Sequence, residues 1–299
     1  MNHGQILCIL GESGCGKTSL LKAIRGFMDR DKGEIYFQNK RVFNKSEKLV
    51  PGTKGVGIVH QDFQLEPGYT VYDNIRHHLI QYQKSYQESK TEEIIRLCKL
   101  ELLRNKTSKE LSGGQKQKVA LAKAMIEEPP LLLLDEPFSN LDNISKAEFK
   151  IILKDIVKEL KIGLLFVTHD SKDALTFSDE IMVIQKGSLL KMGTPQELTE
   201  APPSKYAAQL LGLINIFSGV ELNKAIGLEL DENNDYWISQ SSIKLTNGED
   251  YEIKQELFLG EEFIYTLSNK KINLIYKSKS KLKKNTFNID VLTPLLIKN

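Results

Sequence analysis

The stretch Gly-Glu-Ser-Gly-Cys-Gly-Lys-Thr, residues 11–18, constrains this chain more than any other feature. It fits the pattern G-x-x-x-x-G-K-[S/T], in which the backbone N–H groups of a glycine-rich loop close around phosphate oxygens. The apolar run 6–10 precedes it and predicts a strand buried on both faces. Helical spacing follows from Thr18 and ends at Gly26. Strand, loop and helix N-terminus together predict a phosphate-binding site.

We expect the residues of this loop to bind a nucleotide; they are Gly11, Ser13, Gly14, Cys15, Gly16, Lys17 and Thr18. Lys17 can reach the outer phosphates, and the Thr18 hydroxyl can bind the magnesium ion that accompanies them. Cys15 occupies a variable position of the pattern, so we interpret its thiol as filler and not as a nucleophile. A chance glycine-rich turn is the alternative, but all fixed positions and both flanks fit the pattern.

Length and charge limit the other possibilities. With 299 residues the chain is long enough for two domains. Its net charge of +2 is too small to indicate a nucleic acid or an anionic membrane as a partner. No apolar run approaches the roughly 18–20 residues that a membrane span requires. Cys8, Cys15 and Cys98 lack the spacing of metal ligands, which favours free thiols in a reducing cytosol.

Two adjacent carboxylates follow the apolar run 131–134, which predicts a central parallel strand. Asp135 then lies at the carboxyl end of that strand, beside the phosphate loop, where it can hold magnesium. Glu136 can polarise a water molecule against the terminal phosphate. The alternative is a polar strand end at a turn, because Pro137 follows directly.

A second helix start that could bind an anion is predicted at Leu-Ser-Gly-Gly-Gln, residues 111–115. Ser112 is a good N-cap, the two glycines permit close approach of the backbone, and an amphipathic helix follows. A helix that is merely well capped explains these residues equally well, and the segment alone leaves the two readings open.

Two more polar residues follow predicted strands. Gln61 comes after one apolar run, at a position where ligands bind in α/β sheets, and its neutral amide could hold magnesium or water. His169 comes after another run and could donate a hydrogen bond to a terminal phosphate, although a structural role is the alternative. A metal site built from His60, His77 and His78 is disfavoured, because the adjacent pair points to different sides of a helix.

The pattern predicts two domains, 1–212 and 213–299. The first is an α/β domain with an all-helical insert at about 71–125, in which we expect helices over 72–87 and 91–103. The second has short alternating runs, with turn signals at Asn247-Gly248 and 268–270, and predicts a small all-β domain, a partial OB-like barrel. Its lysine-rich segment 277–284 favours a solvated edge strand or hairpin tip, because no aromatic residues interleave.

Taken in order, these motifs resemble those of the ATP-binding cassette (ABC) transporter ATPases over about residues 4–200. The resemblance rests on 11–18, Gln61, 111–115, 131–136, Asn140–Asp142 and His169. The run Asp-Glu-Pro-Phe-Ser-Asn-Leu-Asp at 135–142 is similar to the importer subgroup that serves iron, polyamines, sulfate, molybdate or sugars. The tail resembles the TOBE-type domain of that subgroup. The resemblance implies a P-loop NTPase fold and an ATP-hydrolysing subunit of an importer.

The resemblance also implies roles for the site residues, with ATP and Mg²⁺ bound between the two chains of a homodimer. The phosphate loop of one chain would face the signature helix start of the other, which is Ser112, Gly113, Gly114 and Gln115. Glu136 would be the general base, His169 would contact the γ-phosphate, and Asp142 would help to couple the two sites. Metal ligands would be Thr18, Gln61 and Asp135.

The implied partners are two transmembrane permease subunits on separate chains, served indirectly by an extracytoplasmic binding protein, with no nucleic acid. The chain would then lie peripherally on the cytoplasmic face of the cell membrane. The helical insert, with the loop 63–71, would receive a helix from a permease. Two alternatives are an ATP-binding regulatory module without turnover and a soluble ABC protein without a transport role. The chain carries no long coiled-coil insert of the kind that such soluble proteins have.

The chain departs from the family pattern at three places. Relatives carry two strands and an adenine-stacking aromatic residue before the first buried strand, so we expect the natural protein to begin upstream of Met1. Lys118 stands where the family generally has Arg, which keeps the charge but loses the planar guanidinium. The tail is shorter than the paired barrel modules common in the subgroup.

Overall fold

Five parallel strands and one antiparallel edge strand form the central sheet of the first unit, Met1–Pro195. In spatial order they are β4 (Val56–Val59), β5 (Leu131–Asp135), β6 (Gly163–Thr168), β1 (Ile6–Leu10), β7 (Glu180–Gln185) and β8 (Ser188–Gly193). Every residue of β1 and β6 is buried. Continuous apolar runs form such strands because helices cover both faces of a parallel sheet.

The computed structural model describes residues 3–291 and 294–297. The chain divides into the first unit and a second unit, Gln196–Asn299. The boundary expected between residues 212 and 213 stays a prediction. Met1, expected to be an internal start, lies outside the described residues.

The parallel register brings the carboxyl ends of three strands to one edge of the sheet. Leu10 of β1 pairs with Thr168 of β6, and Asp135 of β5 pairs with Val167 of β6. The loops that follow these strands therefore begin side by side, although they are far apart in the sequence.

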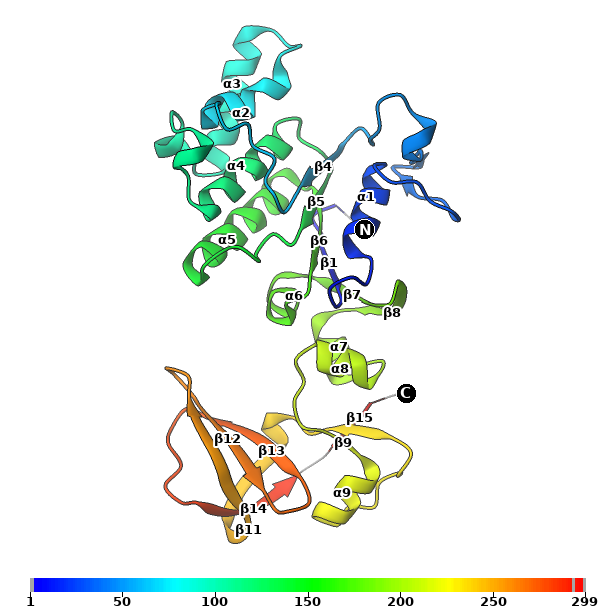
Figure 1. Ribbon diagram of the computed structural model, residues 1–299, viewed down its shortest axis with the longest axis vertical. Helices are drawn as coiled ribbons and strands as arrows, with labels where there is room; N and C mark the ends of the chain where they lie inside the picture. Colours follow the sequence, from blue (N-terminus) through cyan, green and yellow to red (C-terminus); the bar gives the residue numbers. More distant parts are fainter. Residues whose placement is uncertain (1–2, 292–293, 298–299) are drawn as a thin grey trace. The chain divides into compact units, whose positions relative to one another are not determined.

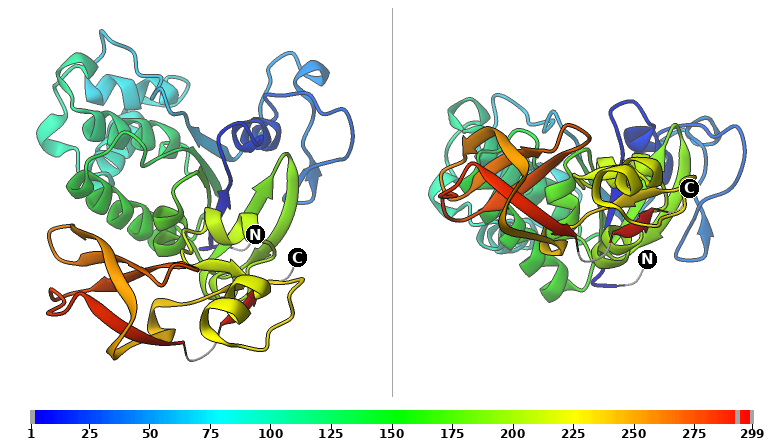
Figure 2. Two further views of the ribbon diagram at one scale, coloured as in Figure 1. Left: turned by 60° about the horizontal axis from the view of Figure 1, so that its bottom comes forward. Right: turned by 90° about the horizontal axis from the view of Figure 1, so that it is seen from below.

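Helices cover the two faces of this sheet (Figures 1 and 2). On one face lies α1 (Lys17–Arg25), which ends as expected at Gly26 with a left-handed φ of 79°. On the other lie α4 (Gly113–Met125), α5 (Asn143–Leu160) and α6 (Ser171–Phe177). Between α1 and β4 the chain forms a short hairpin, β2 (Tyr36–Phe37) and β3 (Lys40–Arg41), and the 3-10 turn η1 (Lys45–Glu47).

The elements of the segment from residue 71 to 125 are helices and 3-10 turns, and the first two helices lie elsewhere than expected. The elements before α4 are α2 (Val71–Arg76), η2 (His77–Leu79), α3 (Lys84–Leu97), η3 (Glu101–Leu103) and η4 (Ser108–Glu110). The helix expected over 72–87 is interrupted at residues 80–83, which are all exposed, so that no buried face holds a helix there. The helix expected over 91–103 ends at Leu97, and Lys99 takes a left-handed φ of 55°.

The second unit contains two antiparallel sheets, which confirm the expected fold class. One has the order β15-β10-β9, with β9 (Ile216–Ser218), β10 (Asp235–Trp237) and β15 (Leu295–Ile297). The other has the order β13-β12-β11-β14, with β11 (Ile243–Phe258), β12 (Phe263–Ser268), β13 (Asn273–Ser278) and β14 (Thr286–Val291). The remaining elements are α7 (Pro195–Glu200), α8 (Lys205–Leu210), α9 (Gly219–Ile226) and η5 (Gln240–Ser242).

One of the two turns expected in this unit is wrong. Asn247-Gly248 lies inside the long strand β11, where the register against β14 shifts between Thr246 and Tyr251. A Cβ at Gly248 would lie 1.7 Å from the Asn288 side-chain oxygen, so glycine marks a bulge with close approach and not a hairpin turn. The other turn, after Ser268, joins β12 to β13 as expected.

Leu133 in β5 tests the core of the first unit, because its side chain is fully buried. We expect Leu133→Ala to lower the free energy of unfolding by about 2–5 kcal/mol, since it removes apolar contacts and leaves a cavity. Urea denaturation measures the loss. Leu102→Ala is the matched control, because Leu102 is 96% exposed. Equal losses in the two variants would contradict the described core.

Candidate functional site

The phosphate loop leaves β1 and enters α1 through glycines that its backbone requires. Gly14 and Gly16 have φ values of 81° and 101°, a region that favours glycine. A Cβ at Gly11 would lie 2.6 Å from the Cys15 sulfur and 2.7 Å from the Ile184 carbonyl oxygen. Cys15 is buried against this glycine, which fits its interpretation as filler. The loop is therefore closed by backbone geometry that bulkier residues would disturb.

The Lys17 side chain is buried and spans this loop. Its Nζ donates to the Gly11 carbonyl at 2.8 Å and to the Glu12 carbonyl at 2.9 Å. An ammonium group has three donors, so these bonds use two of them. The charge is thus fixed inside the loop, with one further donor for an anion.

Thr18 and Asp135 come together from α1 and β5. The Thr18 hydroxyl donates to Asp135 Oδ1 at 3.0 Å. Magnesium takes oxygen ligands, and a carboxylate beside a hydroxyl supplies them, so this pair fits the ion. No cluster of three His, Cys, Asp or Glu side chains that could hold a metal occurs among residues 3–291 and 294–297.

A cavity of about 340 Å³ joins these groups to three other predicted residues. Its lining consists of Ser13, Gly14, Gly16, Lys17, Thr18, Ser19, Gln61, Glu136 and His169. The three residues expected to be catalytic, Gln61, Glu136 and His169, thus share one cavity with the phosphate loop. Asp135 is connected to the cavity through its bond to Thr18.

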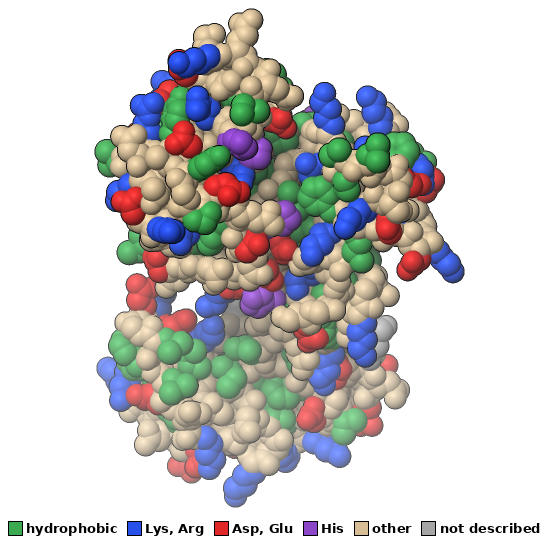
Figure 3. Space-filling model, turned by 45° about the horizontal axis from the view of Figure 1, so that its top comes forward, with side chains coloured by type: hydrophobic (Ala, Val, Ile, Leu, Met, Phe, Trp, Pro, Cys, Tyr) green, Lys and Arg blue, Asp and Glu red, His purple; other side chains and the backbone are tan. Residues whose placement is uncertain are grey.

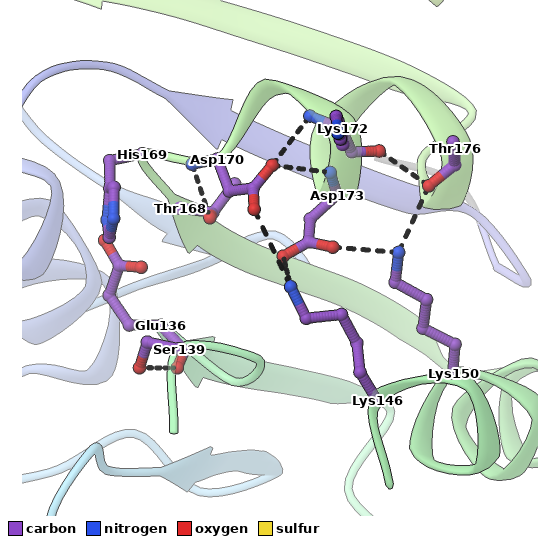
Figure 4. A network of polar contacts seen from close by, with 10 residues as sticks. All are labelled: Glu136, Ser139, Lys146, Lys150, Thr168, His169, Asp170, Lys172, Asp173 and Thr176. Carbon is purple, nitrogen blue, oxygen red and sulfur yellow. Dashed lines mark hydrogen bonds and ion pairs between the residues drawn. The ribbon is translucent and has the colours of Figure 1, made fainter. Parts of the chain in front are cut away.

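Glu136 and His169 form a pair in this cavity (Figure 4). His169 Nδ1 lies 2.9 Å from Glu136 Oε1. The Glu136 side chain is 14% exposed and that of His169 is 55% exposed. Glu136 has a left-handed φ of 49°, an uncommon conformation for a residue other than glycine. Its N–H donates to the Val167 carbonyl at 3.1 Å, which fixes this backbone against β6.

The signature segment at 112–115 does not line the cavity. Ser112 caps α4: its Oγ accepts from the N–H of Gln115 at 3.3 Å, while the Gln115 side chain accepts from the N–H of Ser112 at 3.0 Å. A Cβ at Gly113 would lie 3.4 Å from the Asn140 carbonyl, and one at Gly114 would lie 3.2 Å from Ser145. Within one chain, the signature therefore lies beside the loop before α5, away from the phosphate loop.

Asp142 caps α5. Its Oδ1 accepts from the N–H groups of Ile144 and Ser145, both at 3.0 Å, and its Oδ2 accepts from the Ser145 hydroxyl at 2.6 Å. Bonds from the Ser145 hydroxyl and N–H lower the pKa of the Asp142 carboxyl. Asp142 is thus placed near the signature, but its carboxylate is used locally as a helix cap.

A larger cavity, of about 490 Å³, lies between β4 and the helical insert. Its lining includes His60, His78, Arg25, Lys123 and Glu127. Burial lowers the pKa of both His60 and His78. Figure 3 looks onto this side of the first unit, where histidine side chains line a hollowed strip. The sequence did not predict that His60 and His78 line one groove, because they were considered only together with His77 as metal ligands.

Comparisons with known proteins identify the family of this chain. Residues 1–139 match the family model described as "ABC transporter". The chain is 36% identical over 298 residues to the "Spermidine/putrescine import ATP-binding protein PotA" of Borreliella afzelii, covering 93% of this chain and 84% of that protein. The protein of the same name from Clostridioides difficile is 37% identical over 269 residues, covering 85% and 76%.

Solved structures show the same fold. A dimeric post-hydrolysis state of the ATP-binding cassette MJ0796, bound to ADP and Pi, has a TM-score of 0.57 and 27% identity and covers 65% of this chain and 88% of that one. For cbiO1 from Clostridium perfringens the TM-score is 0.60 and the identity 26%, covering 75% and 85%. The expected family and importer subgroup are confirmed, and the two alternatives without transport are not favoured. The chain belongs to the ABC transporter family, as an ATP-binding and ATP-hydrolysing subunit.

Proposed function

We propose that two copies of this chain enclose two ATP molecules and hydrolyse them to drive polyamine import through a membrane permease. The proposal rests on the observation that the predicted site residues lie at two separate places in one chain. The phosphate loop, Glu136 and His169 line one cavity, whereas the signature helix start lies outside it in the same chain. A second copy would bring its Ser112-capped helix to the phosphates. The dimeric structures of MJ0796 support this arrangement.

Each residue then has a role in phosphoryl transfer to water. Lys17 would bind the outer phosphates with its remaining donor, and Thr18 and Asp135 would hold a magnesium ion, which would neutralise phosphate charge. Gln61 would contact the ion and orient the attacking water. Glu136 takes a proton from that water, and His169 donates a hydrogen bond to the γ-phosphate. Catalysis in this scheme is positioning and electrostatic stabilisation.

The groove between β4 and the helical insert is the proposed docking place for a permease helix. Phe63 and Gln64, at the start of the loop 63–71, line this groove together with His78 of the insert. The described residues contain no helix with the length and apolarity needed to cross a bilayer. From the similarity to import ATP-binding proteins, we place the chain peripherally at the cytoplasmic face, with two permease subunits on separate chains. An extracytoplasmic binding protein would deliver the cargo to them.

Polyamine cargo is inferred from the names of the relatives. The decisive experiment measures uptake of radiolabelled putrescine and spermidine by cells that lack this gene and by cells that carry it together with its permease genes. We expect uptake only in the second strain, and Lys17→Ala should abolish it. Uptake of maltose or sulfate in place of polyamines would refute the cargo assignment while leaving the ATPase assignment intact.

Glu136→Gln tests the base. We expect steady-state ATP hydrolysis to fall by about 10²–10⁴-fold, because an amide cannot accept the proton, while ATP binding is retained and a dimer accumulates. Phosphate release and analytical ultracentrifugation with ATP measure these effects. Glu159→Gln, on the exposed side of α5, is the control and should leave both unchanged. Turnover by Glu136→Gln equal to that of the wild type would exclude Glu136 as the base.

Heterodimers carrying Lys17→Ala and Ser112→Arg test whether each site is shared. If each ATP lies between chains, placing the substitutions on different chains puts both defects in one site and leaves the other intact. Placing them on the same chain damages both sites. In a Glu136→Gln background we expect trapped nucleotide only in the first heterodimer. The reverse result would mean that each chain builds a complete site alone.

A further inference from the structure

We propose that Lys146 is a positioning residue for His169, holding the backbone that carries this histidine at the distance from Glu136 that hydrolysis needs. The inference rests on the proposed roles of Glu136 and His169. It concerns a network of ion pairs between α5 and α6 that neither the sequence motifs nor the proposed chemistry uses. Figure 4 shows this network beside the Glu136–His169 pair.

The His169 backbone is held between two anchored neighbours. Thr168, the last residue of β6, is buried, and its Oγ1 accepts a hydrogen bond from the Asp170 N–H at 3.0 Å. Asp170 caps α6, because its Oδ1 accepts from the N–H groups of Lys172 at 2.8 Å and Asp173 at 3.2 Å. The position of the imidazole therefore follows from where the first turn of α6 lies.

Lys146 is the group that ties this first turn to α5. Its Nζ lies 3.0 Å from Asp173 Oδ2 and 3.6 Å from Asp170 Oδ2, so one ammonium binds both carboxylates at the start of α6. Lys146 itself belongs to the first turn of α5, and its N–H donates to the carbonyl of the cap residue Asp142 at 2.8 Å. The Lys146 side chain thus joins the two helix starts, and one of its partners, Asp170, is the residue next to His169.

A second lysine, Lys150, also pairs with Asp173, so it can serve as a control for the effect of Lys146 on stability. Lys150 Nζ lies 2.9 Å from Asp173 Oδ1 and 3.1 Å from the Thr176 hydroxyl. The Asp173 side chain is only 4% exposed. Loss of either lysine therefore leaves a buried carboxylate with one positive charge fewer to offset the cost of its burial. The ion pair of Asp170, next to His169, is made with Lys146. Both lysines therefore support the fold, but Lys146 reaches the residue beside the histidine.

Glu136 is fixed by other contacts. Its N–H is bound to the Val167 carbonyl, and its own carbonyl accepts from the Ser139 hydroxyl at 3.0 Å. A change at Lys146 would consequently move His169 while Glu136 stays in place. The 2.9 Å contact between them would lengthen.

The test compares Lys146→Met with Lys150→Met in the full chain. We expect Lys146→Met to lower kcat for ATP hydrolysis by about ten- to a hundredfold, since small displacements of a catalytic group cost this much. The KM for ATP should change little, because the phosphate loop is untouched. Lys146→Arg keeps the charge and should restore most of kcat. Lys150→Met should unfold as easily in urea as Lys146→Met but retain kcat near the wild-type value.

A double-mutant cycle with Asp170→Asn and an NMR measurement complete the test. Asn still caps a helix but loses the charge, so its effect on kcat should not add to that of Lys146→Met. The His169 imidazole resonance, assigned with His169→Gln, should shift in Lys146→Met and not in Lys150→Met. Additive effects, equal losses of kcat in the two lysine variants, or an unmoved His169 resonance would overturn the proposal. The resonance reports on Lys146 even if Glu136→Gln shows that the assigned base is wrong.

Discussion

The parallel pairing of β1, β6 and β5 is the constraint on which the rest of the first unit depends. The middle residues of these strands are buried on both faces, so a shift of their hydrogen-bonded register would draw polar strand ends such as Asp135 into the apolar interior. Because they run in the same direction, the loops that follow them emerge at one edge. The phosphate loop, Asp135 with Glu136, and His169 meet there, and no contact between their side chains is needed to bring them together.

This dependence explains which parts of the site could be predicted from the sequence. A short apolar run followed by polar residues predicts a buried strand. It also predicts that those polar residues lie at the edge of the sheet where the parallel strands end. The cavity that joins Lys17, Gln61, Glu136 and His169 follows from four such runs. The caps Ser112 and Asp142 were also recognisable, since their side chains compete for backbone N–H groups at helix starts.

What could not be predicted depends on packing between distant segments. The break after Leu79 reflects the lack of a buried face, which the apolar pattern of 72–87 did not reveal. The glycine at 248 serves close approach to Asn288 on another strand, and local turn chemistry cannot distinguish this from a hairpin. The pairing of Lys146 with Asp170 and Asp173 joins residues on separate helices, with no signature in the sequence around either.

The backbone at Glu136 has a consequence for how this position can vary. Its left-handed φ of 49° disfavours most side chains, but glycine or asparagine would adopt it readily. Replacement by either would relax the main chain and remove the carboxylate at once. Selection for stability therefore favours glycine or asparagine at this position, whereas selection for ATP hydrolysis favours glutamate. In a member of the family that had lost its activity, we expect glycine or asparagine to replace this glutamate.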